Sequence, residues 1–538
     1  MRNNKTKIKF LYLFFIPITL AFLFENIFKE ISLKAFYNLI ENLLFAIALM
    51  CPLYFIKKIK WNKIYFVVVY LFFCFCTYFE SAYYYLFNTY FSPSAIFVIF
   101  ESNLNEAKEF VSFYIDTPLL FFTLIFTLTS FILVFKYEVI ELFNIKRTKK
   151  TTIKVVSVFV AILLFLKIST LIVFNLPYLI IKSNLEYYKE SEIFGNYKEN
   201  KNGNFHDVKR LINPNQDEEL YVIIIGESTN RYHLGIYDYY RQTTPKLSKI
   251  KDELLIYNNV ISPHAYSVGA LTKILTLGNY ESPEKVTKGS IIQLINSVGF
   301  DTYWLSNQRP IGPYESLITK ISMSAKYSKF ITTTIAGNST VLDGELVKEL
   351  DKTIKQLKNK KNVIFLHLMG THHHYENRYP NIFNKFLDNP ITNFKSKENF
   401  EKINHYDNTI LYNDFLITDI LNKVSKLNKK SFVLYFSDHG EEMFNDLDMA
   451  GHNEDVYSKN MFDVPFILWQ SPKYILEKNI PFAANRKYMI DDLIHGIADL
   501  LDIKSKETNP SRSIFNDNFI SRKRVIKDTI DYDTFFKK

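Results

Sequence analysis

LYVIIIGESTNRYHLGIYDYYRQTTP, residues Leu220 to Pro245, is the stretch that decides the fold. It opens with a short run of apolar and mostly β-branched residues, Tyr221 to Ile225, which Gly226 ends. Such a run predicts a buried strand of a parallel sheet followed by a tight turn. Glu227 then stands just past the carboxyl end of the strand, where open α/β sheets bind their ligands. Its carboxylate could also simply cap the next helix, so this stretch alone leaves a structural role open.

The first 175 residues are much more apolar than the rest of the chain. They contain five apolar segments, each close to the ~20 residues that cross a bilayer. Buried helices of a soluble core are the alternative, but the short charged loops between the segments argue against it. The five predicted spans are Phe10–Phe24, Phe36–Ile56, Ile64–Phe79, Pro118–Phe135 and Val155–Phe174.

Basic residues in the loops predict the orientation of these spans, because loops rich in Lys and Arg stay in the cytoplasm. Basic residues precede the first span and separate the second from the third and the fourth from the fifth. We therefore expect a cytoplasmic N-terminus and place everything after Phe174 outside the cytoplasm. No small-residue cleavage site follows the first span, so we expect it to remain as an anchor.

Charge and cysteine content limit the partners and the chemistry. The formal net charge is +10, much of it in the predicted cytoplasmic loops. Anionic lipid explains such a surface, and since no nucleic-acid-binding motif is visible we expect no nucleic-acid partner. The cysteines, Cys51, Cys74 and Cys76, all lie in predicted spans. The external domain therefore has no disulfide and must depend on a large core.

From Leu220 onward, short apolar runs alternate with helical patterns, which predicts an α/β domain with a central mostly parallel sheet. The strand candidates are Tyr221–Ile225, Leu254–Val260, Thr302–Leu305, Val363–Leu368, Phe432–Phe436 and Pro465–Trp469. The helix candidates are Val268–Leu277, Ser290–Val298, Leu342–Leu357, Tyr406–Val424 and Ile490–Leu501. The predicted domains are a five-helix transmembrane domain (1–175), a membrane-surface linker (176–218) and the external α/β domain (219–538).

A second strand end carries the motif SDHG, residues Ser437–Gly440, directly after the apolar run Phe432–Phe436. Asp438 and His439 should therefore point into the same crevice as Glu227. Carboxylates and imidazoles are ordinary zinc ligands. An Asp-His pair alone is a weak signal, but two carboxylates and one imidazole brought by strand ends predict a metal site.

Ser267, in the stretch SPHAYSVGALTKIL, stands just before a predicted helix. At that place its hydroxyl meets the positive end of the helix dipole, and a bound metal would lower its pKa and make it a nucleophile. Its alternative role is a plain N-cap, and both roles can hold together. Thr272 lies nearby as a second candidate nucleophile.

Histidines follow a third strand end in HLMGTHHHYENRYP, which starts at His367. The adjacent His372, His373 and His374 cannot all face the crevice, and we expect His372 to reach it. His452, in AGHNED, follows the SDHG motif along the chain. Either His372 or His452 could bind a phosphate oxygen or protonate a leaving group.

Together, the motifs GES with YRQTTP, HLMGTH, YDNTILYNDF, SDHG and the later GH resemble those of the phosphoethanolamine transferases. These are membrane enzymes of the alkaline phosphatase and sulfatase superfamily, and the resemblance covers nearly the whole chain. The zinc ligands that it implies are Glu227, Ser267, Asp438 and His439, with Ser267 as the nucleophile. The substrate-binding residues that it implies are His372, His452, Ser102 and Glu106, the last two for a lipid headgroup. The family nucleophile is usually threonine, and family members often have disulfides, so this chain departs at both points.

The resemblance implies transfer of phosphoethanolamine from phosphatidylethanolamine to lipid A or the core of lipopolysaccharide or lipooligosaccharide. The reaction would pass through a phosphoserine intermediate at a zinc site of a sulfatase-like domain, on the periplasmic side of the bacterial inner membrane. Resistance to cationic antimicrobial peptides would follow. The alternatives are a phosphoglycerol transferase of the lipoteichoic-acid type, a membrane-tethered phosphodiesterase or sulfatase, and a non-catalytic sensor. Ser267 lacks the C/S-x-P-x-R context of a sulfatase.

Overall fold

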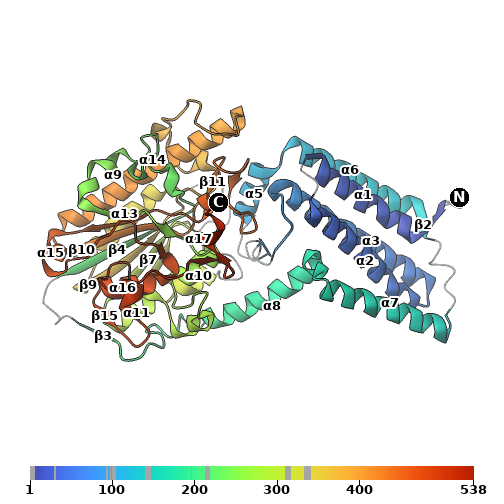
Figure 1. The fold of residues 1–538 in the computed structure, drawn as a ribbon, viewed down its shortest axis with the longest axis horizontal. Helices are drawn as coiled ribbons and strands as arrows, with labels where there is room; N and C mark the ends of the chain where they lie inside the picture. The colour runs from blue at the N-terminus through green and yellow to red at the C-terminus, as the bar shows by residue number, and fades with distance from the viewer. Residues whose placement is uncertain are drawn as a thin grey trace. The chain divides into compact units, whose positions relative to one another are not determined.

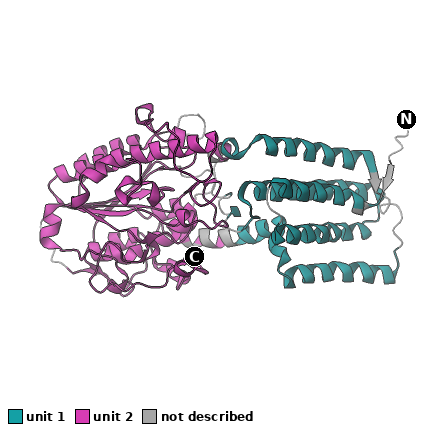
Figure 2. Ribbon diagram, turned by 45° about the horizontal axis from the view of Figure 1, so that its top comes forward, with its two compact units in different colours: residues 1–100, 111–187 teal, residues 101–110, 188–538 magenta. Residues whose placement is uncertain are grey.

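The chain forms two compact units (Figure 2): residues 1–100 and 111–187, and residues 101–110 and 188–538. We call them the helical unit and the sheet unit. The computed structural model describes residues 6–28, 32–92, 95–96, 99, 104–139, 147–195, 197–211, 218–308, 317–332 and 341–537. Each unit has its own core, so the two are described separately.

The helical unit consists of long apolar helices. Among its described residues, four stretches are long and apolar enough to cross a membrane: α2 with its following turn (Leu33–Tyr54), α3 (Ile59–Phe87), α6 (Thr117–Lys136) and α7 (Lys149–Ile168). Helix α2 itself covers Leu33–Met50, and the apolar part of α1 (Phe10–Phe28) is the shorter stretch Tyr12–Phe28. The structure therefore supports four of the five predicted spans, and the first stays a prediction.

Buried polar side chains connect the helices of this unit. Asn42 of α2 donates a hydrogen bond to Glu80 of α3 (Nδ2–Oε2 3.0 Å), and Asn175 donates one to Glu41 of α2 (Nδ2–Oε1 2.8 Å). Unpaired polar groups are costly in an apolar environment. These pairs therefore specify how the helices pack.

Two helices include the boundary between the units. Helix α5 (Leu104–Tyr114) contains Glu106, whereas Ser102 lies outside the described residues. The segment predicted as a membrane-surface linker begins with helix α8 (Leu176–Gly195), inside which the division between the units falls. Its position at a membrane surface stays a prediction.

The sheet unit contains a seven-stranded sheet with helices against it (Figure 1). In spatial order the strands are β5 (Leu254–Ile256), β13 (Phe466–Gln470), β10 (Lys430–Ser437), β4 (Glu219–Gly226), β9 (Lys361–His367), β7 (Asp301–Ser306) and β8 (Tyr327–Phe330). β4 is buried along its whole length, as expected for a strand covered on both faces. The predicted strand Leu254–Val260 is two short strands, β5 and β6 (Val260–Ile261), and β8 was not predicted.

The sheet is mixed, so the prediction of a mostly parallel sheet is not confirmed. β10, β4, β9, β7 and β8 pair in parallel, but β13 runs antiparallel to both β10 and β5. A parallel return needs a crossover, usually a helix. Between β10 and β13 the described chain has only β11 (Glu442–Met443), β12 (Ala450–Gly451) and the short 3-10 helix Lys459–Met461. The chain therefore re-enters from the edge where β10 ends.

The five helices that the sequence predicted are present, although α14 begins at Lys397 and not at Tyr406, and α9, α12, α15 and α17 were not predicted. Helices α9, α13 and α14 are drawn above the sheet in Figure 1, and α10, α11 and α16 below it. Their bounds are α9 Pro245–Lys249, α10 Ser267–Ile274, α11 Ile291–Ser297, α12 Leu317–Ser322, α13 Asp343–Lys355, α14 Lys397–Lys426, α15 Pro472–Glu477, α16 Leu493–Leu500 and α17 Tyr532–Phe535. The predicted helix Ile490–Leu501 begins as a 3-10 turn, Ile490–Asp492.

Glycines in two turns bring the strand ends close together. Gly370, after β9, has a φ of 53°, and a Cβ there would lie 2.8 Å from the backbone nitrogen of Glu227. Gly440, after β10, packs so closely on the following loop that a Cβ would lie 2.1 Å from the carbonyl oxygen of Asn460. Any side chain at either position would push the turns apart.

We predict that Gly370→Ala destabilises the sheet unit. The left-handed backbone costs about 1 kcal/mol for alanine, and the contact with Glu227 adds roughly 1–3 kcal/mol of overpacking. The midpoint of thermal unfolding of the full chain in detergent measures the effect. Gly195→Ala is the control, because a Cβ at Gly195 meets nothing within 4 Å. Equal midpoints for the two variants would contradict the close approach of the two turns.

Candidate metal and nucleophile site

Three neighbouring strands end at one edge of the sheet. Gly226 at the end of β4 is in register with Ser437 of β10, and Ile225 is in register with His367 of β9. The residues that follow these strands therefore meet at this edge, as the sequence predicted. They include Glu227 after β4 and Asp438 after β10.

Glu227, Asp438 and His439 form a buried cluster. The imidazole Nε2 of His439 lies 3.4 Å from Glu227 Oε1 and 3.6 Å from Asp438 Oδ2. One candidate ligand atom from each of the three lies within 4.8 Å of the others, and none is more than 1% exposed. The structure therefore brings together the three residues that the strand ends predicted.

Ser267 directs its hydroxyl into this cluster. The Oγ donates to Glu227, at 3.0 Å from Oε1 and 3.1 Å from Oε2, and lies 3.3 Å from His439 Nε2. Ser267 is the first residue of α10, whose N-cap is Tyr266, so the plain N-cap role is wrong. Ser267 is half-buried, whereas the cluster beneath it is fully buried. Its hydroxyl is therefore the group of this cluster that a substrate can reach.

The second candidate nucleophile, Thr272, lies further along the same helix. Its hydroxyl donates to the carbonyl oxygen of Gly269 at 3.0 Å. This bond lies within the helix itself, as is common for threonine. The geometry therefore favours Ser267 over Thr272.

Two carboxylates share the cluster with one imidazole: against the effect of burial, the charge of Asp438 and the hydrogen bond and charge of Glu227 raise the pKa of His439 to about 10. Burial, and then the charge of Glu227, raise the pKa of Asp438 to about 8. Burial alone would raise the pKa of Glu227, but the hydrogen bond and charge of His439 hold it well below its usual value. Asp438 Oδ1 accepts from the backbone N–H groups of Ser228 and His439, whereas its Oδ2, 3.6 Å from His439 Nε2, is buried without a hydrogen-bond partner among the described residues. Two buried carboxylates, one with an orphaned oxygen, fit a bound cation.

The donor set fits zinc. Two carboxylates, one imidazole and a hydroxyl offer oxygen and nitrogen atoms, and zinc takes such ligands in a tetrahedral arrangement. Because Ser267 Oγ is one of the four, the reactive position of a catalytic site would be occupied by the nucleophile itself.

His452 lies beside the cluster and is oriented by a carboxylate. Its ring centroid is 4.2 Å from that of His439, and its Nδ1 is 2.7 Å from Glu441 Oε2. Glu441 is fully buried and accepts a second hydrogen bond from the Tyr375 hydroxyl at 2.7 Å. A carboxylate on Nδ1 fixes the tautomer and leaves Nε2 for the site.

His372 is a half-buried imidazole whose Nδ1 is itself buried. Burial lowers its pKa to about 3, against the opposing effect of the Glu227 charge. Its ring centroid is 3.9 Å from that of His373, and its Nδ1 has no hydrogen-bond partner among the described residues. His374 instead has a positive φ of 60° and bonds Glu376 (Nδ1–Oε1 3.0 Å). The three histidines therefore differ in their contacts, and the role of His372 in binding the substrate stays a prediction.

Arg378 supports the turn that carries these histidines. Its guanidinium donates to the carbonyl oxygens of His372 and His373, both at 3.2 Å from Nε, and pairs with Glu109 of α5 (NH2–Oε2 2.6 Å). Glu109 belongs to the sheet unit, one helical turn after Glu106. The pair therefore fixes the backbone of α5 near the predicted headgroup residue.

Three residues of the site were missed by sequence reasoning. Gln308, after β7, donates to Glu227 (Nε2–Oε2 2.8 Å), and no motif surrounds it in the sequence. Ser228 donates to the same carboxylate (Oγ–Oε1 2.8 Å) from a strained backbone with φ of 55°. Glu441 directly follows the SDHG motif, and this nearness in the sequence to Asp438 and His439 could have predicted that it lies at the site.

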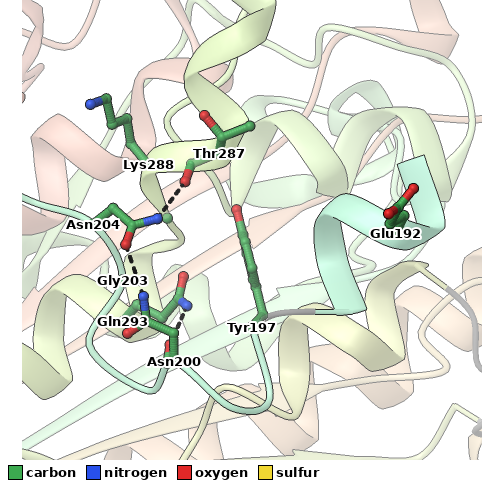
Figure 3. Close-up of a pocket in the computed structure, with 9 residues that line it drawn as sticks. Glu192, Tyr197, Asn200, Gly203, Asn204, Thr287, Lys288 and Gln293 are labelled. Atoms are coloured by element: carbon green, nitrogen blue, oxygen red, sulfur yellow. Dashed lines mark hydrogen bonds between the residues drawn. The ribbon is translucent and has the colours of Figure 1, made fainter. Parts of the chain in front are cut away.

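A separate cavity of about 330 Å³ lies where the residues after α8 meet α11, away from the predicted site residues (Figure 3). Its amide side chains bond one another: Asn200 donates to Asn204 (3.0 Å), Asn204 to the Thr287 carbonyl (3.0 Å) and Gln293 to the Asn200 carbonyl (2.6 Å). These bonds hold residues 200–204 against α11 and the turn before it. The polar groups that line the cavity therefore serve to attach residues 200–204 to α11.

Comparison with known proteins places this site in a known family. The family model described as Sulfatase matches residues 219–503. Phosphoethanolamine transferase EptC of Escherichia coli (strain K12) is 29% identical over 487 residues, which cover 84% of this chain and 83% of that protein. The Kdo(2)-lipid A phosphoethanolamine 7''-transferase of Escherichia coli (strain K12) is 28% identical over 288 residues, covering 50% and 49%.

Solved structures extend the likeness to three dimensions. The C-terminal periplasmic domain of Escherichia coli EptC, in complex with Zn, is 29% identical with a TM-score of 0.59, covering 61% of this chain and 96% of that one. The integral membrane protein lipooligosaccharide phosphoethanolamine transferase A (EptA) from Neisseria meningitidis has a TM-score of 0.69 at 17% identity, covering 95% and 99%. The latter likeness is one of fold, and it includes both units.

We predict that Asp438→Asn stabilises the metal-free protein. The amide keeps the bonds at Oδ1 and removes a charge whose folded-state pKa, about 8, lies far above the ~3.9 of an unfolded chain. A raised carboxyl pKa costs stability as pH rises from ~4 to 8, so the gain should be absent at pH 4 and largest above pH 8. The midpoints of thermal unfolding of the two proteins, measured in the presence of a chelator, give the gain in stability. Without chelator, added zinc should stabilise the wild type more than the variant.

Asp463→Asn is the matched control with the opposite sign. Asp463 is equally buried, but Arg231 donates to it at 2.9 Å and the hydroxyls of Tyr232 and Tyr532 also donate. Loss of that charge leaves Arg231 unpaired and should destabilise the fold by about 3–5 kcal/mol. Equal destabilisation by both substitutions would show that the Asp438 charge is compensated by protein groups.

Proposed function

The chain belongs to the sulfatase family, and on that premise we propose that it transfers phosphoethanolamine from phosphatidylethanolamine to a lipid acceptor, lipid A or the lipopolysaccharide or lipooligosaccharide core. Several relatives are named as phosphoethanolamine transferases, two of them for Kdo(2)-lipid A. The observation that carries the proposal is the half-buried hydroxyl of Ser267, held by Glu227 and next to His439 at the edge of the sheet.

The proposed first step forms a bond between Ser267 Oγ and the donor phosphorus and breaks the bond from phosphorus to the diacylglycerol oxygen. Glu227, whose oxygens lie 3.0 and 3.1 Å from the hydroxyl, can take the proton of Ser267. The diacylglycerol oxygen takes up a proton as it leaves, from His452 or water. In the second step an acceptor oxygen forms a bond to the phosphorus and the bond from phosphorus to Ser267 Oγ breaks. Glu227 returns its proton to Ser267 Oγ, and His452 or water takes up the proton of an acceptor hydroxyl.

Glu227, Ser267, Asp438 and His439 would hold one Zn²⁺. When bound, it would supply a Lewis acid that lowers the pKa of the Ser267 hydroxyl and offsets the charge of the phosphoryl oxygens. The orphaned Oδ2 of Asp438 and the donor set support this assignment. His372 and His452 would bind the phosphoryl oxygens or, for His452, move a proton.

We place this chemistry at the bacterial inner membrane. Residues 1–175 would span it five times from a cytoplasmic N-terminus, residues 176–218 would run along its surface and residues 219–538 would form the periplasmic catalytic domain. The four long apolar helices support this arrangement. Ser102 and Glu106 would receive the donor headgroup, and the ion pair between Arg378 and Glu109, on the helix that contains Glu106, supports a binding role for this helix.

We predict that intact mass of the full chain incubated with phosphatidylethanolamine shows a phosphoethanolamine adduct on the peptide that contains Ser267. Ser267→Ala removes the nucleophile and should abolish the adduct, whereas Thr272→Ala should keep it. An adduct that survives in Ser267→Ala would refute the assignment of the nucleophile. A wild-type adduct only with phosphatidylglycerol would identify a phosphoglycerol transferase, and release to water alone would identify a phosphodiesterase.

Ser267→Thr should keep the adduct, because threonine offers the same hydroxyl and is the usual nucleophile of the family that the motifs resemble. Its β-branched side chain is restricted at χ1, so we expect a change in rate within about tenfold. Single-turnover formation of the adduct measures it. Complete loss of the adduct would mean that the site has no room for the extra methyl group.

A further inference from the structure

Gln308 holds the carboxylate of Glu227 from the side opposite Ser228. Its amide nitrogen lies 2.8 Å from Glu227 Oε2, and the Ser228 hydroxyl lies 2.8 Å from Glu227 Oε1. Apart from the Ser267 hydroxyl, which lies 3.0 and 3.1 Å from the two oxygens, each carboxylate oxygen therefore accepts one hydrogen bond from a neutral protein donor. Since each oxygen can accept about two, one acceptor position per oxygen is left, and Ser267 faces both.

The orientation of the Gln308 amide is fixed by its surroundings. Its nitrogen also lies 3.1 Å from the carbonyl oxygen of Leu368, the first residue after β9. Both neighbours, a carboxylate and a carbonyl, are acceptors only, so the amide nitrogen and not its oxygen must face them. Both N–H groups of Gln308 are used, and they join the ends of three strands, β7, β4 and β9.

The backbone beneath Gln308 is anchored as well. Its N–H donates to Ser306 Oγ at 3.1 Å, and Asn307 N–H donates to the carbonyl oxygen of His367 at 3.0 Å. The Asn307 side chain donates to Asp343 at 2.8 Å, which in turn accepts from the backbone N–H of Gly370 at 2.9 Å. Gln308 therefore projects from a rigid support, which is what a positioning residue requires.

We propose that Gln308 is a positioning residue that sets the metal affinity of the site through Glu227 and does not touch the substrate. The inference rests on the proposed function for the identity of the site, but it concerns only how this chain prepares the ligand. Hydrogen-bond partners of a ligating carboxylate typically change metal affinity by about 10- to 100-fold when removed. A site that lost Gln308 would keep its ligands but bind the metal more weakly.

Gln308→Met tests this, because methionine conserves the shape and removes both donors. We expect the Kd for Zn²⁺ of the full chain, measured in detergent by competition with a chromophoric chelator, to rise about 10- to 100-fold. Gln293→Met is the matched control: the Gln293 amide also makes hydrogen bonds within the protein, to Ser290 N–H and the Asn200 carbonyl, but Gln293 belongs to α11 and not to the site. A wild-type zinc Kd in a folded Gln308→Met protein would overturn the proposal.

Two further measurements separate the possible failures. The asparagine of Gln308→Asn is too short to reach both the Glu227 carboxylate and the Leu368 carbonyl oxygen, so this variant should also weaken zinc binding. It therefore tests the proposal even if the methionine variant misfolds. Excess zinc should restore adduct formation by Gln308→Met, with an unchanged KM for the lipid donor. A raised KM at saturating zinc would mean that Gln308 contacts the donor, and this result would overturn the proposal. If the wild type forms no adduct at all, the proposed function fails, and the zinc Kd still decides the role of Gln308.

Discussion

Two carboxylates share one buried crevice, and much of the sheet unit serves to keep them there. Glu227 and Asp438 are at most 1% exposed, and both lie within 3.6 Å of the His439 Nε2. Like charges in a water-poor environment repel, which is why burial and the charge of Glu227 raise the pKa of Asp438 to about 8. Such an arrangement survives only because the surrounding fold overdetermines it. A divalent cation between the two carboxylates would replace this repulsion with attraction.

The restraint comes from strand register, tight turns and a dense set of donors. β4 and β10 end level with each other, and Gly370 lets the turn after β9 approach the backbone of Glu227. Away from the site, buried ion pairs such as Arg231–Asp463 and Arg522–Asp491 connect the site loops and the C-terminal segment to the sheet unit. No cysteine lies in this unit, so packing and these pairs do the work that disulfides do in many exported domains.

The sequence predicted what strands and motifs encode, and it could not predict what only the tertiary structure brings together. Glu227, Asp438 and His439 were predictable, since each follows an apolar run that ends at the same edge of the sheet. The direction of β13 was not, because hydrophobic periodicity carries no strand direction. Gln308 was not predictable either: it follows an ordinary strand without a motif, and its role depends on how β7 is placed beside β9 and β4. Ser102 lies outside the described residues, so its predicted role stays a prediction.

The choice of serine at position 267 makes the support of Glu227 more important. A threonine is stiff at χ1 because its second branch restricts the rotamer, whereas a serine hydroxyl has three accessible staggered positions. In this chain the hydroxyl of Ser267 is selected by its bonds to both oxygens of Glu227. The position of the Ser267 hydroxyl therefore depends on the position of the Glu227 carboxylate. That carboxylate is in turn held by Ser228 and Gln308. A neutral amide suits this task, because it fixes the carboxylate without competing with a cation for its charge.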